Sequence, residues 1–473
     1  MESLDCIKNG RNSEKQFLIN CLLFLVMNGG LYAADMQKPS RPNVLYIVAD
    51  DMGYADCGVQ GCKDIPTPNL DALAAGGIRF TDGYVTGAVC SPSRAALMTG
   101  RHQLRDGVPD WIPYGKPGLG AGVPTVASYL KKAGYRTALV GKWHLGEQEG
   151  CNPLNRGFDE FYGFLGGGRS YFPEKSKAGQ AKVNHYTQLV RGREPVEQPE
   201  YTTHAFGKEG ANFIERQKGQ DQPFFLYLAF NAVHTPMEAP EDYLQKFASI
   251  KDKKRRTYAG MLSAMDDAIG RVLKALREAG LEENTFICFI SDNGGPIVRN
   301  APNASRNTPL RGGKGETWEG GVRVPFFLKW TGHLKAGSTF DEPVIQMDIT
   351  ATVLALAGAE MDGKWPINGV NLMPYLKGDK KNPHETLCWE YGKQWAIRQG
   401  PWKLTYAFPT KVAKAPVQGL FDLGRDIGES NDLSAAQPER VKEMKVTWEK
   451  WRKEVGGNLP AQAIDVKNVN HAP

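Results

Sequence analysis

The sequence predicts an α/β protein: a large mixed, mainly parallel sheet sandwiched by helices, followed by a smaller subdomain of antiparallel sheet and helix. Continuous apolar runs, typical of strands buried on both faces, occur at 44–49, 224–230 and 285–290. Beyond about residue 371, short strand patterns follow one another closely, as in an antiparallel meander. We therefore predict a main N-terminal domain over 34–370 and a C-terminal subdomain over 371–473.

The composition is that of an ordinary globular protein. The chain has 473 residues, of which 41% are hydrophobic and 23% charged, so it can bury an ample core. The formal net charge of +6 suits a polyanionic substrate but is far too small to indicate nucleic-acid binding. Composition says nothing about the oligomeric state.

The N-terminal segment has the pattern of a secretory signal. An apolar run from Phe17 to Met27 follows basic residues, and Leu31-Tyr32-Ala33 offers a small-residue cleavage site. Because the run is too short for a spanning helix, we predict a signal peptide over 1–33, with an uncleaved anchor as the alternative. No other segment has the length and apolarity of a membrane span. We therefore expect export, to the periplasm or the extracellular space.

Helices and strands follow from periodicity and capping residues, in chain order. Beyond the three runs above, strands are predicted at 78–80, 136–140, 324–330, 385–391, 395–399 and 402–406. Helices are predicted at 70–75, 91–98, 126–133, 258–276, 348–356 and 438–455. Asn69 would cap the first of these helices. The segment 170–210 lacks periodicity and is predicted as substrate-facing loops, and the basic cluster 251–256 as a solvated helix face.

Two pairs of polar residues follow buried strands directly. Asp50-Asp51 ends the first strand and Asp292-Asn293 ends the run 285–290. A turn-forming role is the simple alternative, but buried carboxylates are costly unless a cation compensates them. Three carboxylates and one amide are hard oxygen ligands, so they predict a site for Ca²⁺, with Mg²⁺ as the second choice.

A helix N-terminus is predicted at Val89-Cys90-Ser91-Pro92-Ser93-Arg94, with Ser91 as N-cap and Gly100 at the end of the helix. Cys90 would lie at the positive end of the helix dipole with Arg94 one turn further on, an arrangement suited to anion binding. A buried structural cysteine beside a surface arginine is the alternative interpretation.

Further cations and imidazoles lie near strand ends. Lys142 and His144 share one face of the chain after the strand 136–140, and His234 follows the run 224–230. Open α/β sheets bind their ligands at such ends. Lys314 lies in a Gly-rich stretch that would let the backbone approach a ligand closely. A solvated lysine or a core histidine is the alternative at each position.

Six cysteines remain outside the N-terminal segment: Cys57, Cys62, Cys90, Cys151, Cys288 and Cys388. An oxidising compartment would allow a disulfide, with Cys57–Cys62 across a Gly-rich turn as the candidate. The sequence has no Cys-x-x-Cys motif, so zinc and iron–sulfur sites lack support.

Together these motifs resemble the type I sulfatases, a formylglycine-dependent family of the alkaline-phosphatase-like superfamily. The resemblance rests on Cys-x-Pro-Ser-Arg with a following Thr-Gly-Arg, Gly-Lys-x-His at 141–144, Asp-Asp, Asp-Asn and the Gly-rich run 314–325. It extends in order from Asn43 to about Leu433. The chain is similar to secreted bacterial arylsulfatases and to carbohydrate sulfatases of the N-acetylgalactosamine-6-sulfatase type.

The resemblance implies that a maturase, a formylglycine-generating enzyme, converts Cys90 to an aldehyde whose hydrate is the nucleophile. It also implies calcium ligation by the four residues Asp50, Asp51, Asp292 and Asn293. Arg94 would hold the hydrate and Lys142 would bridge it to the sulfate. Lys314 and His234 would contact sulfate and protonate the leaving alcohol, and His144 would remove a proton to expel sulfate and regenerate the aldehyde.

The expected substrate is a sulfated carbohydrate, such as a fragment of a sulfated polysaccharide. Aromatic residues in open loops favour a sugar ligand, namely Trp111, Tyr114, Tyr171 and Phe172. The sugar, the linkage and the position of the sulfate stay open. A phosphonate monoester or phosphodiester hydrolase is the alternative enzyme, and a non-catalytic receptor for sulfated glycans is the alternative outside enzymes.

Overall fold

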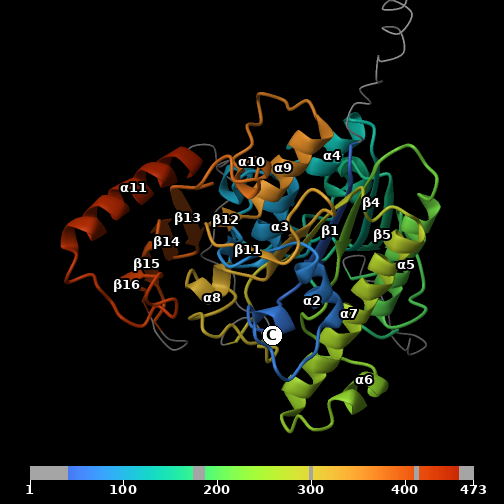
Figure 1. Cartoon of the computed structure of the whole chain (residues 1–473), viewed down its shortest axis with the longest axis horizontal. Coiled ribbons are helices and arrows are strands. Elements are labelled where there is room, and N and C mark those ends of the chain that lie inside the picture. Colours follow the sequence, from blue (N-terminus) through green and yellow to red (C-terminus); the bar gives the residue numbers. More distant parts are fainter. Residues whose placement is uncertain (1–40, 174–186, 298–301, 410–414, 457–473) are drawn as a thin grey trace, which may run out of the picture. The chain divides into compact units, whose positions relative to one another are not determined.

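A ten-stranded sheet forms the centre of the chain, in the order β11-β2-β10-β9-β1-β8-β4-β5-β6-β7. Its strands β1, β4, β5 and β11 are labelled in Figure 1. The computed structural model describes residues 41–173, 187–297, 302–409 and 415–456. The five strands β9, β1, β8, β4 and β5 are mutually parallel, and β10 runs antiparallel beside β9. The α/β class with a mainly parallel sheet is therefore confirmed. The strands of this sheet are β1 (Asn43–Ala49), β2 (Ile78–Phe80), β4 (Arg136–Lys142), β5 (Glu160–Phe164), β6 (Val190–Arg191), β7 (Glu194–Pro195), β8 (Phe224–Ala229), β9 (Thr285–Ser291), β10 (Phe326–Lys329) and β11 (Ser338–Phe340).

Helices cover both faces of this sheet. Alternate residues of β1 enter two separate cores: Leu45 and Ile47 pack with α2, α5 and α7, whereas Tyr46 and Val48 pack with α3, α4 and α9. The helices are α2 (Pro68–Ala75), α3 (Cys90–Thr99), α4 (Val126–Lys132), α5 (Thr202–Arg216), α6 (Glu241–Lys246), α7 (Lys253–Glu278), α8 (Glu319–Val322), α9 (Met347–Ala357), α10 (Met373–Leu376) and α11 (Pro438–Gly456). Short 3₁₀ turns are η1 (Gly58–Gln60), η2 (Gln103–Asp106), η3 (Glu149–Cys151) and η4 (Pro153–Arg156).

The C-terminal part is an antiparallel sheet covered by one long helix, as predicted. Its strands are β13 (Thr386–Tyr391), β14 (Gln394–Gln399), β15 (Trp402–Ala407) and β16 (Val417–Asp422). One face packs on α11, where the rings of Trp395 and Trp448 stack with centroids 4.6 Å apart. The other face packs on α3 and on β3 (Gly83–Tyr84), which pairs with β12 (Val344–Ile345). The domain limits at 34, 370 and 371 stay predictions.

The predicted loops at 170–210 are partly wrong, because α5 begins at Thr202. Helix α5 packs tightly on α7: a Cβ on Gly207 would lie 2.7 Å from the Cβ of Ala268. The glycines that permit this close approach also weaken the helix signal in the sequence. Helix α2 begins at Pro68 with Thr67 at its N-cap, two positions ahead of the predicted N-cap Asn69.

The prediction of a solvated basic face over 251–256 is wrong for Arg255. Its side chain is buried and forms ion pairs with Asp56 (2.7 Å) and Asp64 (2.9 Å). The disulfide suggested for Cys57–Cys62 is also absent, since both thiols are free in the structure. In the described ranges, no helix has the length and apolarity needed to cross a membrane. The predicted signal peptide lies outside the described residues.

Candidate functional site

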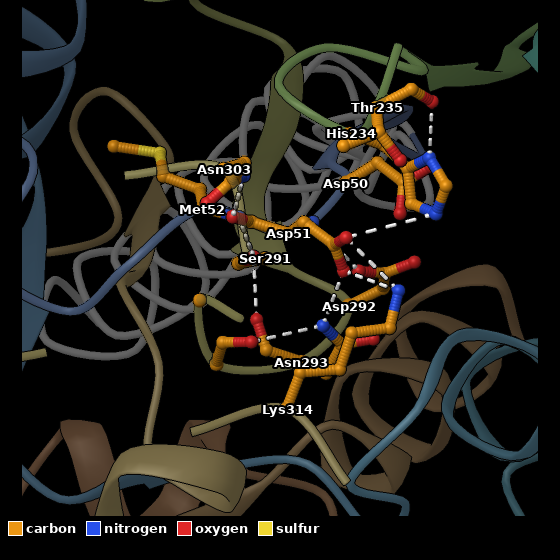
Figure 2. A network of polar contacts seen from close by, with 12 residues as sticks. Asp50, Asp51, Met52, His234, Thr235, Ser291, Asp292, Asn293, Asn303 and Lys314 are labelled. Atoms are coloured by element: carbon orange, nitrogen blue, oxygen red, sulfur yellow. Dashed lines mark hydrogen bonds and ion pairs between the residues drawn. The ribbon is translucent and has the colours of Figure 1, made fainter. Parts of the chain in front are cut away.

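The ends of β1 and β9 bring the predicted oxygen ligands together. The two strands pair in parallel with Ala49 opposite Ser291, so Asp50-Asp51 and Asp292-Asn293 leave the sheet at the same edge. The main-chain N–H of Asp51 donates to Asp292 Oδ1 (3.3 Å), and the Asn293 amide donates to Asp51 Oδ1 (2.7 Å). All four side chains are buried. Figure 2 shows this convergence.

Three buried cations compensate these carboxylates. Lys142 Nζ lies 2.6 Å from Asp50 Oδ2, Lys314 Nζ lies 2.7 Å from Asp51 Oδ1, and the Arg94 guanidinium lies 2.8 Å from Asp292 Oδ2. Burial by itself would raise the pKa of Asp50, but Lys142, His234 and Arg94 outweigh it, so this pKa is lowered. Burial by itself would lower the pKa of Lys314. Asp51 and the other acidic groups nearby outweigh this effect and raise the pKa, so Lys314 is protonated.

The donor set fits a divalent cation. Asp50 Oδ1 and Asn293 Oδ1 are buried and, among the described residues, have no hydrogen-bond partner, although buried polar atoms are usually paired. Ligand atoms of Asp50, Asp51 and His234 lie within 4.8 Å of one another. Two unpaired hard oxygens beside clustered carboxylates are what a cation such as Ca²⁺ or Mg²⁺ would satisfy. His234 adds a ligand atom to this cluster, a role that the sequence did not suggest.

Cys90 is the first residue of α3 rather than the residue before its N-cap. Val89 holds the N-cap position without a side-chain bond, and Ser91 Oγ instead accepts a hydrogen bond from Ile112 N (3.0 Å). Burial raises the pKa of the Cys90 thiol, and the nearby Lys142 and Lys314 only partly offset it. The unmodified residue is therefore a protonated thiol and a poor nucleophile at neutral pH.

Two imidazoles border this cluster. His144 follows β4 in the left-handed region (φ 55°), and Asp51 does the same after β1 (φ 63°), a conformation uncommon for residues other than glycine. Burial lowers the pKa of His144 far below its usual range, and Lys142 adds to this. His144 is therefore neutral and able to accept a proton.

His234 has a fixed tautomer. Its Nδ1 lies 2.6 Å from the carbonyl oxygen of Thr235, which can only accept, so Nδ1 carries the proton. Its Nε2 faces Asp51 Oδ2 at 3.7 Å. Burial and then Lys314 lower the pKa of His234. In this state Nε2 carries a lone pair. It can therefore coordinate a cation or accept a hydrogen bond from the substrate.

Several supporting residues were missed by sequence reasoning. Tyr171, predicted to lie in an open loop, is fully buried, and its hydroxyl donates to the carbonyl of His234 (2.8 Å). Asn303 donates to the carbonyls of Asp51 (3.2 Å) and Val233 (2.9 Å). It therefore connects the segments that follow β1 and β8. No sequence signal distinguishes either from an ordinary loop residue. The other predicted loop aromatics are exposed: Trp111 by 43%, Tyr114 by 61% and Phe172 by 39%.

Known proteins resemble this chain over most of its length. The family model described as "Sulfatase" matches residues 42–359. The N-acetylgalactosamine-6-sulfatase of Homo sapiens is 34% identical over 445 residues, covering 85% of this chain and 83% of the relative. The human steryl-sulfatase is 30% identical, covering 88% of each chain. The crystal structure of Ps i-CgsB in complex with k-i-k-neocarrahexaose has a TM-score of 0.83 at 37% identity, covering 90% of this chain and 96% of that one.

Proposed function

This chain belongs to the sulfatase family and hydrolyses sulfate esters of carbohydrates, and we propose that it does so with a formylglycine made from Cys90 beside a bound Ca²⁺. The observation that carries this proposal is the buried cluster of alternating charges at the carboxyl ends of β1 and β9, next to the N-terminus of α3. A formylglycine-generating maturase is the implied partner.

Formylglycine and a divalent cation would supply the nucleophile and part of the charge neutralisation. A formylglycine at residue 90, as its hydrate, would supply the nucleophilic oxygen, and Asp50, Asp51, Asp292 and Asn293 would hold a divalent cation that neutralises charge on the sulfate. We favour Ca²⁺ over Mg²⁺ because the donors are hard oxygens on separate loops, which suits the more flexible coordination of Ca²⁺.

The protein's own side chains bind the anion and move protons. Lys142 and Lys314 are fixed cations that stabilise charge on the sulfate oxygens as the ester bond breaks. Arg94, held by Asp292, orients the reacting side chain of residue 90. Lys314 is protonated and donates to the leaving alcohol. His234 presents the lone pair of Nε2 in its neutral form, and it would contact sulfate and help to protonate the alcohol once that nitrogen takes up a proton. The neutral His144 would then accept the proton of the hydroxyl group that remains on residue 90. Loss of this proton would expel sulfate and regenerate the aldehyde.

The names of the relatives limit the choice of substrate class. Relatives are N-acetylgalactosamine-6-sulfatases, and a similar structure holds a neocarrahexaose. We propose a sulfated oligosaccharide of these types as the substrate. Export to the periplasm or the extracellular space, which would bring the protein to such polysaccharides, stays a prediction from the N-terminal segment.

Sulfate release from a panel of sulfated mono- and oligosaccharides tests the proposal. The protein would be produced with a formylglycine-generating enzyme, and intact mass would confirm the conversion. Cys90→Ala should abolish turnover while retaining the melting temperature, since the side chain is buried but small. Undiminished activity in Cys90→Ala would contradict the mechanism. Cleavage of a phosphonate ester without sulfate release would favour the alternative enzyme, and binding of sulfated glycan without any release would favour a receptor.

A further inference from the structure

The stretch 311–319, which carries Lys314, contacts both the reaction site and the C-terminal sheet. On the first side, Lys314 Nζ reaches Asp51 at 2.7 Å (Figure 2), and Lys314 N donates to the carbonyl of Gly295 (3.2 Å). Gly315 N donates to the carbonyl of Ala88 (2.8 Å), which lies shortly before Cys90. The main chain at Lys314 is therefore bound to the segments that carry the oxygen ligands and the nucleophile position.

On its other side, this stretch is held by the C-terminal sheet. Gln394, the first residue of β14, is only 4% exposed, and its Nε2 donates to the carbonyl of Gly315 (2.8 Å). Its Oε1 accepts from Phe408 N (3.3 Å), just after β15, so both atoms of the amide are paired. The carbonyl of Phe408 accepts from Trp318 Nε1 (2.9 Å). The amide of Gln394 thus connects the peptide after Lys314 to two strands of the C-terminal sheet.

Both ends of the stretch also bind to this sheet. Lys403 of β15 is fully buried and forms ion pairs with Glu319 (2.9 Å) and Glu429 (2.9 Å). The Arg311 guanidinium donates to the carbonyl of Glu429 (2.8 Å), and Arg311 O accepts from Gly320 N (2.7 Å). The position of Lys314 between these ends is therefore referred to the C-terminal sheet as well as to the main sheet.

Hydrogen bonds, rather than side-chain packing, determine the main-chain path next to Lys314. Gly312, Gly313 and Gly315 have no side chains that could pack, and Gly312 and Gly315 have positive φ of 74° and 82°. Gly315 is buried, so the loss of Gln394 would remove a hydrogen bond from a carbonyl that water cannot readily reach. Such a loss makes the native path less favourable and allows Lys314 to shift.

We propose that Gln394 is a positioning residue, which holds Lys314 where its ammonium group protonates the leaving alcohol. This inference rests on the proposed function, in which a proton passes from Lys314 Nζ to the alcohol oxygen as the S–O bond breaks. Proton donation contributes more to the rate as the leaving group becomes more basic. A displaced Lys314 should therefore slow the release of a sugar alcohol far more than the release of 4-nitrophenol, which is a much weaker base.

The test compares a sulfated sugar with 4-nitrophenyl sulfate, using enzyme that carries formylglycine. Gln394→Met keeps the approximate side-chain volume but cannot donate to Gly315. Its kcat/KM should fall about 10- to 100-fold for the sugar sulfate and less than about threefold for the aryl sulfate. Gln399→Met is the matched control, because it makes the same change on the same strand, where the amide donates to Thr386 (3.2 Å). It should leave the ratio of the two kcat/KM values as it is.

The ratio separates positioning from a folding defect, because unfolded enzyme turns over neither substrate. An equal loss on both substrates in Gln394→Met would overturn the proposal, and so would an unchanged ratio. If Gln394→Met does not fold, Gln394→Glu replaces it in the same comparison, since glutamate keeps the length and the acceptor for Phe408 N. Release of sulfate from neither substrate by the wild type would instead refute the proposed function.

A double-mutant cycle on the sugar sulfate gives a second result, which does not depend on aryl sulfate turnover. Lys314→Ala removes the ammonium group that Gln394 is proposed to position. In that background, measured at high enzyme concentration, Gln394→Met should lower kcat/KM by less than about twofold. A full loss from Gln394→Met in the Lys314→Ala enzyme would show that the amide acts independently of Lys314, and it would contradict the proposal.

Discussion

Gly167 lies against the ring of His144, so an alanine at this position tests whether the imidazole must keep its place. A Cβ would lie 2.7 Å from His144 Cε1 and Nε2, whereas ordinary contact begins at 3.4 Å. The ring would have to retreat by the difference, roughly 0.7 Å. His144 is buried, and its Nε2 approaches Ile112 O at 3.3 Å, so it has little room to move. A misplacement on the order of 1 Å costs about 100-fold in rate, and we expect Gly167→Ala to lower kcat by about that factor.

The assay follows both products in the first turnovers. If His144 acts after the ester bond is broken, Gly167→Ala should release alcohol in a rapid burst and sulfate slowly. Gly168→Ala is the matched control, because its Cβ would lie 3.5 Å from the ring of His234, an ordinary contact. Its activity should stay within about threefold of the wild type, corresponding to less than 1 kcal/mol. Equal activities of the two variants, at equal melting temperatures, would refute the reasoning.

Three further predictions concern stability. Chelation of divalent cations should lower activity and melting temperature together, because a ligand at 100 times its Kd contributes about 2.7 kcal/mol to the stability of the folded state. Addition of Ca²⁺ should restore both quantities. No change in either would contradict a cation site at these oxygen ligands. Arg255→Ala should cost about 3–5 kcal/mol in urea unfolding because it leaves Asp56 buried and unpaired, whereas exposed Lys254→Ala should cost less than about 0.5 kcal/mol. Burial lowers the pKa of His384, but Asp348 at 2.8 Å outweighs it and leaves the pKa raised. Its stabilisation is therefore full below the unfolded pKa of about 6.5 and is lost as pH rises through the folded value, so the melting temperature should decline more between about pH 6 and 9 in the wild type than in His384→Gln.

The predictable part of this protein is the part governed by local pattern. The apolar runs that became β1, β8 and β9 were evident because strands buried on both faces need apolar residues at every position. Their polar ends were equally evident. Because parallel strands end at the same edge, the sequence alone could place Asp50-Asp51 near Asp292-Asn293.

What the sequence could not reveal depends on contacts between distant segments. Arg255 has the local appearance of a solvated helix residue, yet it compensates Asp56, which lies 199 positions earlier. Tyr171 has the appearance of an aromatic residue in an open loop, yet its hydroxyl donates a hydrogen bond to the carbonyl of His234. In each case the side chain is amphipathic or polar, and only the tertiary fold decides whether its partner is water or protein.

The conformations of Asp51 and His144 were unpredictable for a related reason. Both have positive φ, which is unfavourable for residues with a side chain and persists only where surrounding contacts determine the backbone. Such contacts are present: Asn303 donates to the carbonyl of Asp51, and His144 N donates to the carbonyl of Leu165. The parallel sheet thus supplies a rigid edge on which two locally unfavourable conformations are held. The residue types of the site follow from the chemistry of sulfate, but their orientation follows from that edge.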